Sequence, residues 1–232
     1  MFGRRKIAAA VGEFLGTATL AFTVLDVSRS TIGIPYFVAI AAGLAVVVVG
    51  ASFATDVHLN PAVTLALWTA RRVKSLTAVV YIVAQLLGGL AAYGLYKYFV
   101  HGTVQHVSSG YQARILIAEA VGAFVFTLVA SAVFYERVWG YRRAVVVGAA
   151  YAVGIIVASA SSNGFINPAV ALGSNSWGWG TYVLGPVLGA IIGVNLYALL
   201  FATESAVAVK AAAVGASKAK ATKPAKAGGK KK

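Results

Sequence analysis

Two copies of the tripeptide Asn-Pro-Ala hold the side chains of this sequence that are best suited to handling a polar solute. Their residues are Asn60, Pro61, Ala62, Asn167, Pro168 and Ala169. An asparagine side chain offers two N–H donors that can hold a passing oxygen atom, and asparagine is also a favoured helix N-cap. Proline suits the first helical turn, where its missing N–H costs nothing. Each copy therefore predicts the start of a helix with a hydrogen-bond donor beside it.

The segments around the two copies are apolar enough to cross a membrane. The chain of 232 residues is 59% hydrophobic and only 11% charged, whereas soluble domains are about 25% charged. A span needs roughly 20 apolar residues. Six such stretches can be drawn, at residues 7–26, 33–54, 76–99, 114–134, 142–162 and 180–203. The stretch after each Asn-Pro-Ala is too short to span, so it predicts a half-helix that enters the membrane without crossing it.

The two halves of the chain resemble each other. The stretch "AAAVGEFLGTATLAF" in the first aligns with "LIAEAVGAFVFTLVA" in the second, which pairs Glu13 with Glu119. Each half holds three spans, an odd number, so the second half must be inverted relative to the first. We expect repeats over about 7–99 and 114–203, with the functional site between them at the midplane. The predicted fold is an all-α membrane protein with six transmembrane helices and two half-helices in an inverted repeat.

The facing half-helices predict that cations are excluded. The N-terminus of a helix carries roughly half a positive charge from its aligned peptide dipoles. Two such ends that meet at the midplane repel a cation from both sides, while a neutral molecule can pass.

The basic residues indicate how the chain is oriented. Seventeen of the 20 Lys and Arg residues fall on one side of the six-span arrangement, so the positive-inside rule predicts that both termini are cytoplasmic. We expect a multi-pass protein of the plasma membrane, with residues 1–203 forming the membrane domain. The tail, residues 204–232, is rich in Lys, Ala and Gly. Its composition predicts disorder, with contact to anionic lipids rather than to nucleic acid.

These features resemble the aquaporin and aquaglyceroporin family, the major intrinsic proteins. The resemblance rests on the paired Asn-Pro-Ala copies, the glutamates of spans 1 and 4, and the stretches "HLNPAVT", "YIVAQLLGG" and "YVLGPVLGA". It covers residues 7 to about 203. It implies a passive channel for water or small uncharged solutes, with one pore in each subunit of a homotetramer, and neither a cofactor nor a metal.

The residue after the second copy departs from the family pattern. Most members carry an Arg there, within an aromatic/arginine constriction, whereas this chain has Val170. Carried over one by one, the other constriction positions are Ile155, Gly164 and, in span 2, either Ala42 by pattern or Ile40 by residue count. This ring has no charge and no aromatic group. It predicts a wider constriction that admits glycerol, urea, ammonia or gas, although an apolar ring can also dewet and pass water slowly.

Glu13 and Glu119 leave a second mechanism open, because a carboxylate inside a membrane span is costly without partners. If the two glutamates relay protons, the chain is a proton-coupled carrier. As structural acids, which their symmetric placement and the resemblance favour, they accept hydrogen bonds from the backbone that leads into each half-helix. A third alternative is a structural or adhesive membrane protein that does not conduct. An enzyme is not expected, because no nucleophile, base or metal-ligand set accompanies the Asn-Pro-Ala copies.

Overall fold

The computed structural model describes residues 3–30, 35–53, 57–102, 104, 111–136, 141–176 and 178–202. Six helical segments in this part are long and apolar enough to cross a membrane. They are α1 (Arg4–Arg29), α2 (Pro35–Ser52), α4 (Ser75–Val100), α5 (Ala113–Glu136), α6 (Tyr141–Ala158) and the π-helical η1 (Trp179–Val183) continued by α8 (Leu184–Leu200). The predicted tail, residues 204–232, lies outside the described residues.

Two short helices begin at the prolines of the Asn-Pro-Ala copies. α3 (Pro61–Thr69) has nine residues and α7 (Pro168–Gly173) has six. Both are too short to cross a bilayer, since a helix rises about 1.5 Å per residue. The prediction of an all-α fold with six spans and two half-helices is confirmed.

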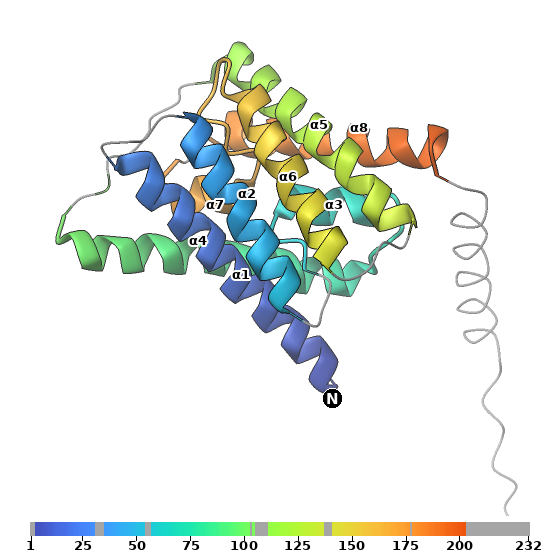
Figure 1. The fold of residues 1–232 in the computed structure, drawn as a ribbon, viewed down its shortest axis with the longest axis horizontal. Helices are drawn as coiled ribbons and strands as arrows, with labels where there is room; N and C mark the ends of the chain where they lie inside the picture. The colour runs from blue at the N-terminus through green and yellow to red at the C-terminus, as the bar shows by residue number, and fades with distance from the viewer. Residues whose placement is uncertain are drawn as a thin grey trace, which may run out of the picture.

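The two halves of the chain pack in corresponding ways. α1 packs against α4 in the first half, and α5 packs against α8 in the second. α2 and α6 pack against each other between the halves, and Figure 1 shows them side by side and antiparallel. Each half-helix contacts the opposite half, α3 against α8 and α7 against α4. The two halves are therefore interlocked around α3 and α7.

Two glycines let α2 and α6 approach closely. A methyl group placed on Gly43 would lie 2.8 Å from the carbonyl oxygen of Gly148. One placed on Gly148 would lie 2.5 Å from the carbonyl oxygen of Gly43. Small residues at helix contacts are typical of membrane proteins, where close backbone packing drives association.

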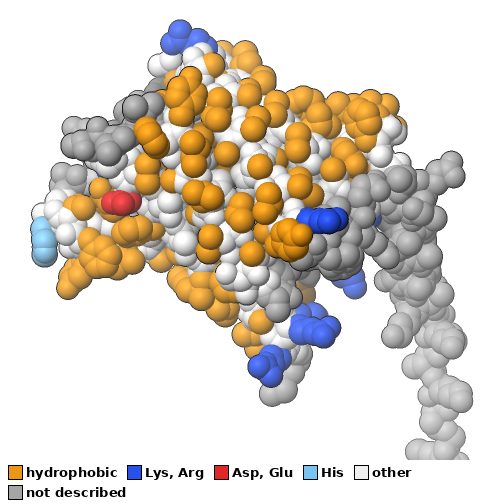
Figure 2. Space-filling view, in the orientation of Figure 1, with side chains coloured by type: hydrophobic (Ala, Val, Ile, Leu, Met, Phe, Trp, Pro, Cys, Tyr) orange, Lys and Arg blue, Asp and Glu red, His pale blue; other side chains and the backbone are white. Residues whose placement is uncertain are grey.

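The outer surface of the spanning helices is apolar. Leu44 of α2, Val83 of α4, Ile117 of α5 and Ile192 of α8 are each more than half exposed. Figure 2 shows hydrophobic side chains spread across one face, with Lys and Arg side chains at its margins. An apolar surface of this extent needs lipid or protein against it rather than water.

α6 ends before its predicted boundary. The expected span reached residue 162, but the helix ends at Ala158. The Ser162 backbone N–H bonds to the Ala158 carbonyl at 3.0 Å, and the Ser162 hydroxyl donates to the Glu119 carboxylate. Serine side chains offer the chain such alternatives to helix, so the chain turns here toward Glu119.

Candidate functional site

Each Asn-Pro-Ala copy caps its own half-helix. The Asn60 side-chain oxygen accepts the backbone N–H of Ala62 at 2.8 Å. The Asn167 oxygen accepts from Ala169 at 3.0 Å and from Val170 at 3.4 Å. Both asparagines have extended backbones and are followed by a proline at the first helical position, the arrangement that asparagine caps and N-terminal prolines favour.

The two copies are also bonded to each other. The Asn60 side-chain nitrogen donates to the carbonyl of Ile166 at 3.0 Å, and the Asn167 nitrogen donates to the carbonyl of Leu59 at 2.8 Å. An asparagine amide has two N–H groups, so this bond leaves one further N–H on each side chain, and that of Asn167 lies within reach of the Tyr151 hydroxyl. The structure thus brings the two predicted asparagines together at the contact between the halves.

Glu13 of α1 holds the loop that leads into α3. Its carboxylate accepts the backbone N–H groups of His58 at 2.7 Å and Leu59 at 2.8 Å, and the Gln85 amide at 2.7 Å. The side chain has no exposed surface. Leu59 adopts a positive φ of 57°, which is unfavourable for a branched residue, and these bonds hold it in that conformation.

Glu119 of α5 does the same for the loop that leads into α7. It accepts the N–H groups of Phe165 at 3.0 Å and Ile166 at 2.5 Å, together with the Ser162 hydroxyl. It is fully buried, and Ile166 has a positive φ of 43°. Both carboxylates are therefore occupied by donors from the half-helix loops.

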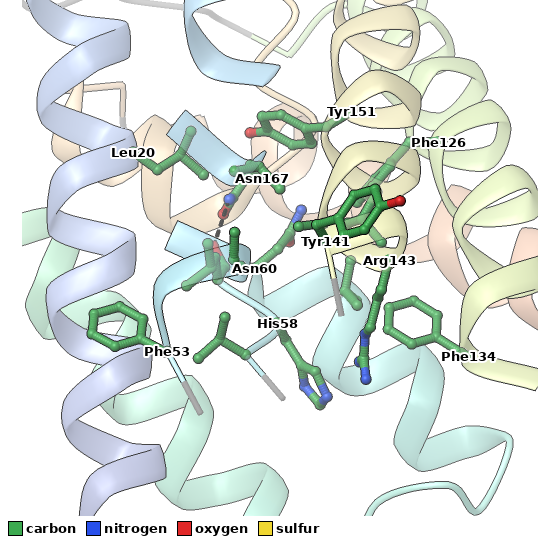
Figure 3. A pocket seen from close by; sticks show the side chains of 18 residues that line it. Leu20, Phe53, His58, Asn60, Phe126, Phe134, Tyr141, Arg143, Tyr151 and Asn167 are labelled. Carbon is green, nitrogen blue, oxygen red and sulfur yellow. Dashed lines mark hydrogen bonds between the residues drawn. The ribbon is translucent and has the colours of Figure 1, made fainter. Parts of the chain in front are cut away.

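A cavity of about 270 Å³ leads from the surface to the asparagine pair. Figure 3 shows Asn60 and Asn167 in its middle, with Tyr151 beyond them and His58, Phe134 and Arg143 at the opposite end. The cavity is lined by Leu20, Val46, Gly50, Ala51, Phe53, Val57, His58, Leu59, Asn60, Val63, Phe126, Phe134, Tyr141, Arg143, Ala144, Val147, Tyr151 and Asn167. Most of its wall is apolar, and its polar groups are concentrated at the asparagine pair and at the mouth.

The mouth of the cavity lies where α2 ends and α6 begins. The Arg143 guanidinium carbon lies 5.3 Å from the centroid of the Phe134 ring. His58 lies edge-on to Phe134, and its Nδ1 is 3.1 Å from the Thr64 hydroxyl. The Arg143 guanidinium thus lies at the mouth of the cavity, beside two aromatic rings.

The residues expected to form the constriction are packed rather than open. Ala42 and Val170 are 0% exposed and Ile155 is 2% exposed. Gly164 has a φ of +67°, and a methyl group placed on it would lie 2.9 Å from the Ile155 carbonyl oxygen. The alternative in span 2, Ile40, is 52% exposed on the outer surface of α2. The structure thus places Ala42 inside the molecule and Ile40 outside it.

The sequence pattern of the family described as Major intrinsic protein (MIP) matches residues 4–197. The chain belongs to the major intrinsic protein family. It is 30% identical over 210 residues to Aquaporin NIP1-1 of Zea mays, which covers 82% of this chain and 73% of that protein.

Two other proteins resemble this chain over nearly their whole length. The chain is 30% identical over 232 residues to Aquaporin Z of Photorhabdus laumondii, covering 86% of this chain and 99% of that protein. The X-ray structure of the aquaglyceroporin from Plasmodium falciparum shares the fold, with a TM-score of 0.64 and 22% identity over 84% of this chain and 96% of that one. This major intrinsic protein is a multi-pass transmembrane channel for water or small solutes, and not an enzyme.

Tyr151 and Arg143 line the cavity of this major intrinsic protein but did not stand out in the sequence. Tyr151 lies four residues before Ile155 in α6, and residues four apart share a helix face. That spacing was a signal that could have placed Tyr151 beside the constriction. Arg143 looked like one of several basic residues at a span end, and nothing in its spacing indicated that it lies beside Phe134.

Proposed function

We propose that this chain is a passive channel for water or other small uncharged solutes, which pass between Asn60 and Asn167. The observation that carries the proposal is the position of the two asparagines. Both line the same cavity, and each has a second side-chain N–H beyond the bond to the opposite loop, that of Asn167 lying within reach of the Tyr151 hydroxyl. A neutral oxygen- or nitrogen-bearing molecule can replace part of its hydration with these donors.

Exclusion of cations follows from the same arrangement. The first turns of α3 and α7 direct backbone N–H groups toward the asparagine pair, and Arg143 adds a full positive charge at the cavity mouth. A cation would lose hydration here and face the positive ends of both half-helices. The family Arg is absent at Val170, so in our account these elements supply the barrier in its place.

An apolar constriction of Ala42, Ile155, Gly164 and Val170 follows the asparagine pair along the proposed path. The burial of Ala42 and the exposure of Ile40 favour Ala42 as the span 2 member. Such a ring offers a solute little to bond with, apart from backbone carbonyls of the loop. Dissolved gas and ammonia, which lose less hydration than a polyol, are therefore candidates beside water, and glycerol and urea are the larger solutes to test.

The hydrogen bonding of the two buried glutamates favours a passive channel over a proton-coupled carrier. Each carboxylate accepts three donors and has no exposed surface. A relay residue has to exchange protons with a cavity, whereas these two hold the half-helix loops. A structural or adhesive protein remains the second alternative, since the burial of the constriction residues is also what a closed pore would have.

We further propose a setting for the channel. The distribution of basic residues supports cytoplasmic termini, which would make the cavity mouth with Arg143 the inner one, and we take the membrane to be the plasma membrane. Residues 1–203 form the channel domain with repeats over about 7–99 and 114–203, and four copies assemble by their apolar outer faces. The tail, residues 204–232, would contact anionic lipids through its lysines.

Stopped-flow light scattering on proteoliposomes tests the proposed function. Vesicles are mixed with sucrose to measure water loss, then with glycerol, urea or an ammonium gradient to measure solute entry. Any of these rates above that of protein-free vesicles supports a channel and names its permeant. Rates equal to those of protein-free vesicles for every solute, with protein that elutes as a single folded species, would favour the structural alternative.

A further inference from the structure

Tyr151 occupies the path between the asparagine pair and the constriction. It lies on the same face of α6 as Ile155 and one turn nearer the start of the helix, a separation of about 6 Å along the helix axis at 1.5 Å per residue. Tyr151 lines the cavity together with both asparagines. Ile155 and Val170 do not line it and are almost fully buried. The cavity therefore ends at the Tyr151 ring before the constriction begins.

The ring of Tyr151 is held in place from two directions. It packs edge-on against Phe126 of α5, with centroids 5.1 Å apart and planes at 78°. Its hydroxyl donates to the Phe165 carbonyl at 3.3 Å, in the loop that leads into α7. Figure 3 shows the ring projecting from α6 beside Asn167, with its hydroxyl directed toward Leu20 of α1. Both Tyr151 and Leu20 are 1% exposed, so the two side chains close this end of the cavity.

We propose that Tyr151 is the specificity-determining residue of the pore, and that it restricts passage to molecules of one heavy atom, such as water and ammonia. This inference rests on the proposed function. The phenol ring blocks solutes of several heavy atoms, such as glycerol and urea, at the end of the cavity beside Asn167. The hydroxyl oxygen faces the Asn167 amide and keeps a second lone pair that can accept a hydrogen bond from a permeant, while Asn60 donates one. Tyr151 thereby supplies both the steric limit and the polar contact that the apolar ring of Ala42, Ile155 and Val170 lacks.

Single-cysteine variants test this role, because the chain contains no cysteine. Tyr151→Cys removes the ring and places one thiol at the end of the cavity. We expect glycerol and urea entry into proteoliposomes to rise on the order of tenfold, the scale on which pockets discriminate by small differences in size. Benzyl methanethiosulfonate, which restores a ring at this position, is expected to return the rate to the wild-type value, and dithiothreitol to reverse the block. The reversal occurs in protein that is already folded and inserted.

Tyr96→Cys is the matched control. Tyr96 is also buried and packs edge-on against a phenylalanine, Phe22, with centroids 5.8 Å apart, but it does not line the cavity. This variant is expected to keep wild-type rates before and after the reagent. Tyr151→Phe separates the two contributions of the side chain. Its glycerol rate should stay at the wild-type value while its water or ammonia rate falls, because the ring remains and the hydroxyl is lost.

The outcomes separate this inference from the proposed function. If wild type conducts water or ammonia and Tyr151→Cys admits glycerol no faster, the channel stands and the role of Tyr151 is overturned. If wild type conducts nothing but Tyr151→Cys admits glycerol and the reagent blocks it, Tyr151 closes the path and the wild-type channel function fails. Should Tyr151→Cys fail to insert, Tyr151→Leu keeps most of the apolar volume and is expected to raise urea entry. Urea entry at the wild-type rate in that variant overturns the inference.

Discussion

Asn60 and Asn167 each donate a side-chain N–H to the carbonyl that immediately precedes the other, at 3.0 Å to Ile166 and 2.8 Å to Leu59. These hydrogen bonds join residues 106 and 108 positions apart in sequence. They connect the two half-helices through the same residues that we propose contact the permeant. A change at either asparagine is therefore expected to affect both stability and passage.

Asn167→Ala is expected to destabilise the fold by about 1–3 kcal/mol, because it leaves the buried Leu59 carbonyl without its donor and α7 without its cap. The thermal unfolding midpoint of the detergent-solubilised protein measures this loss. Asn195→Ala is the control, since the Asn195 amide caps no half-helix and bonds to the Ile191 carbonyl within its own helix and, at an exposed position, to the Thr69 hydroxyl. Equal midpoints for the two variants would argue against the reciprocal bonds as a structural element.

Glu119→Gln is expected to lower the thermal unfolding midpoint. The rate of transport and its response to a pH gradient are expected to stay as in the wild type. A glutamine keeps one acceptor oxygen but turns an N–H₂ group toward backbone donors, which loses a charge-assisted hydrogen bond worth about 1.5–3 kcal/mol. Glu13→Gln should behave in the same way, because its carboxylate also holds two backbone N–H groups. The exposed Asp26 serves as control through Asp26→Asn. A stable variant whose transport loses a response to pH would instead support a proton relay.

Val170→Thr is expected to raise water permeability a few-fold without admitting glycerol. Threonine has nearly the shape of valine but adds a hydroxyl that can bond to water in the apolar constriction. The shrinkage rate of proteoliposomes in sucrose measures the effect. Val194→Thr adds the same hydroxyl to α8, at another residue with 0% exposure, and should leave the rate unchanged. A similar change in both variants would mean that Val170 has no special place on the path.

Gly148→Ala is expected to destabilise the protein by about 1–3 kcal/mol, because its methyl group would meet the Gly43 carbonyl oxygen at 2.5 Å and force α2 and α6 apart. Gly94→Ala is the matched control. A methyl group at Gly94 meets nothing within 4 Å, and alanine favours helix over glycine, so this variant should be at least as stable as wild type. A reversed order of the two unfolding midpoints would contradict the close contact.

The fold was predictable because its signals lie in short stretches of sequence. Six apolar runs, two Asn-Pro-Ala copies and an odd number of spans per half are enough to define an inverted repeat. The end of α6 was misjudged by four residues, since Ser162 leaves the helix to bond Glu119, a contact over 43 residues of sequence. Periodicity along one helix carries no information about such a partner.

The site was less predictable than the fold. Spacing identified Asn60 and Asn167, but not the carbonyls that they bond, because Leu59 and Ile166 adopt positive φ angles that their residue types do not indicate. The sequence pattern indicated Ala42 and the residue count indicated Ile40. The orientation of α2 in the structure buries Ala42 and exposes Ile40. Tyr151 was overlooked because the sequence alone indicates only that a tyrosine in an apolar span packs in the core. The cavity that it lines is visible only in the structure.

The most direct test of the central claim measures water and proton movement in the same vesicles. Proteoliposomes that contain a pH-sensitive dye are shrunk in sucrose, with and without an imposed pH gradient, and compared with protein-free vesicles. We predict faster shrinkage that is the same in both conditions, with no proton entry above that of protein-free vesicles, as expected for a passive channel that excludes cations. Shrinkage at the protein-free rate, or transport that requires the pH gradient and moves protons, would contradict this account.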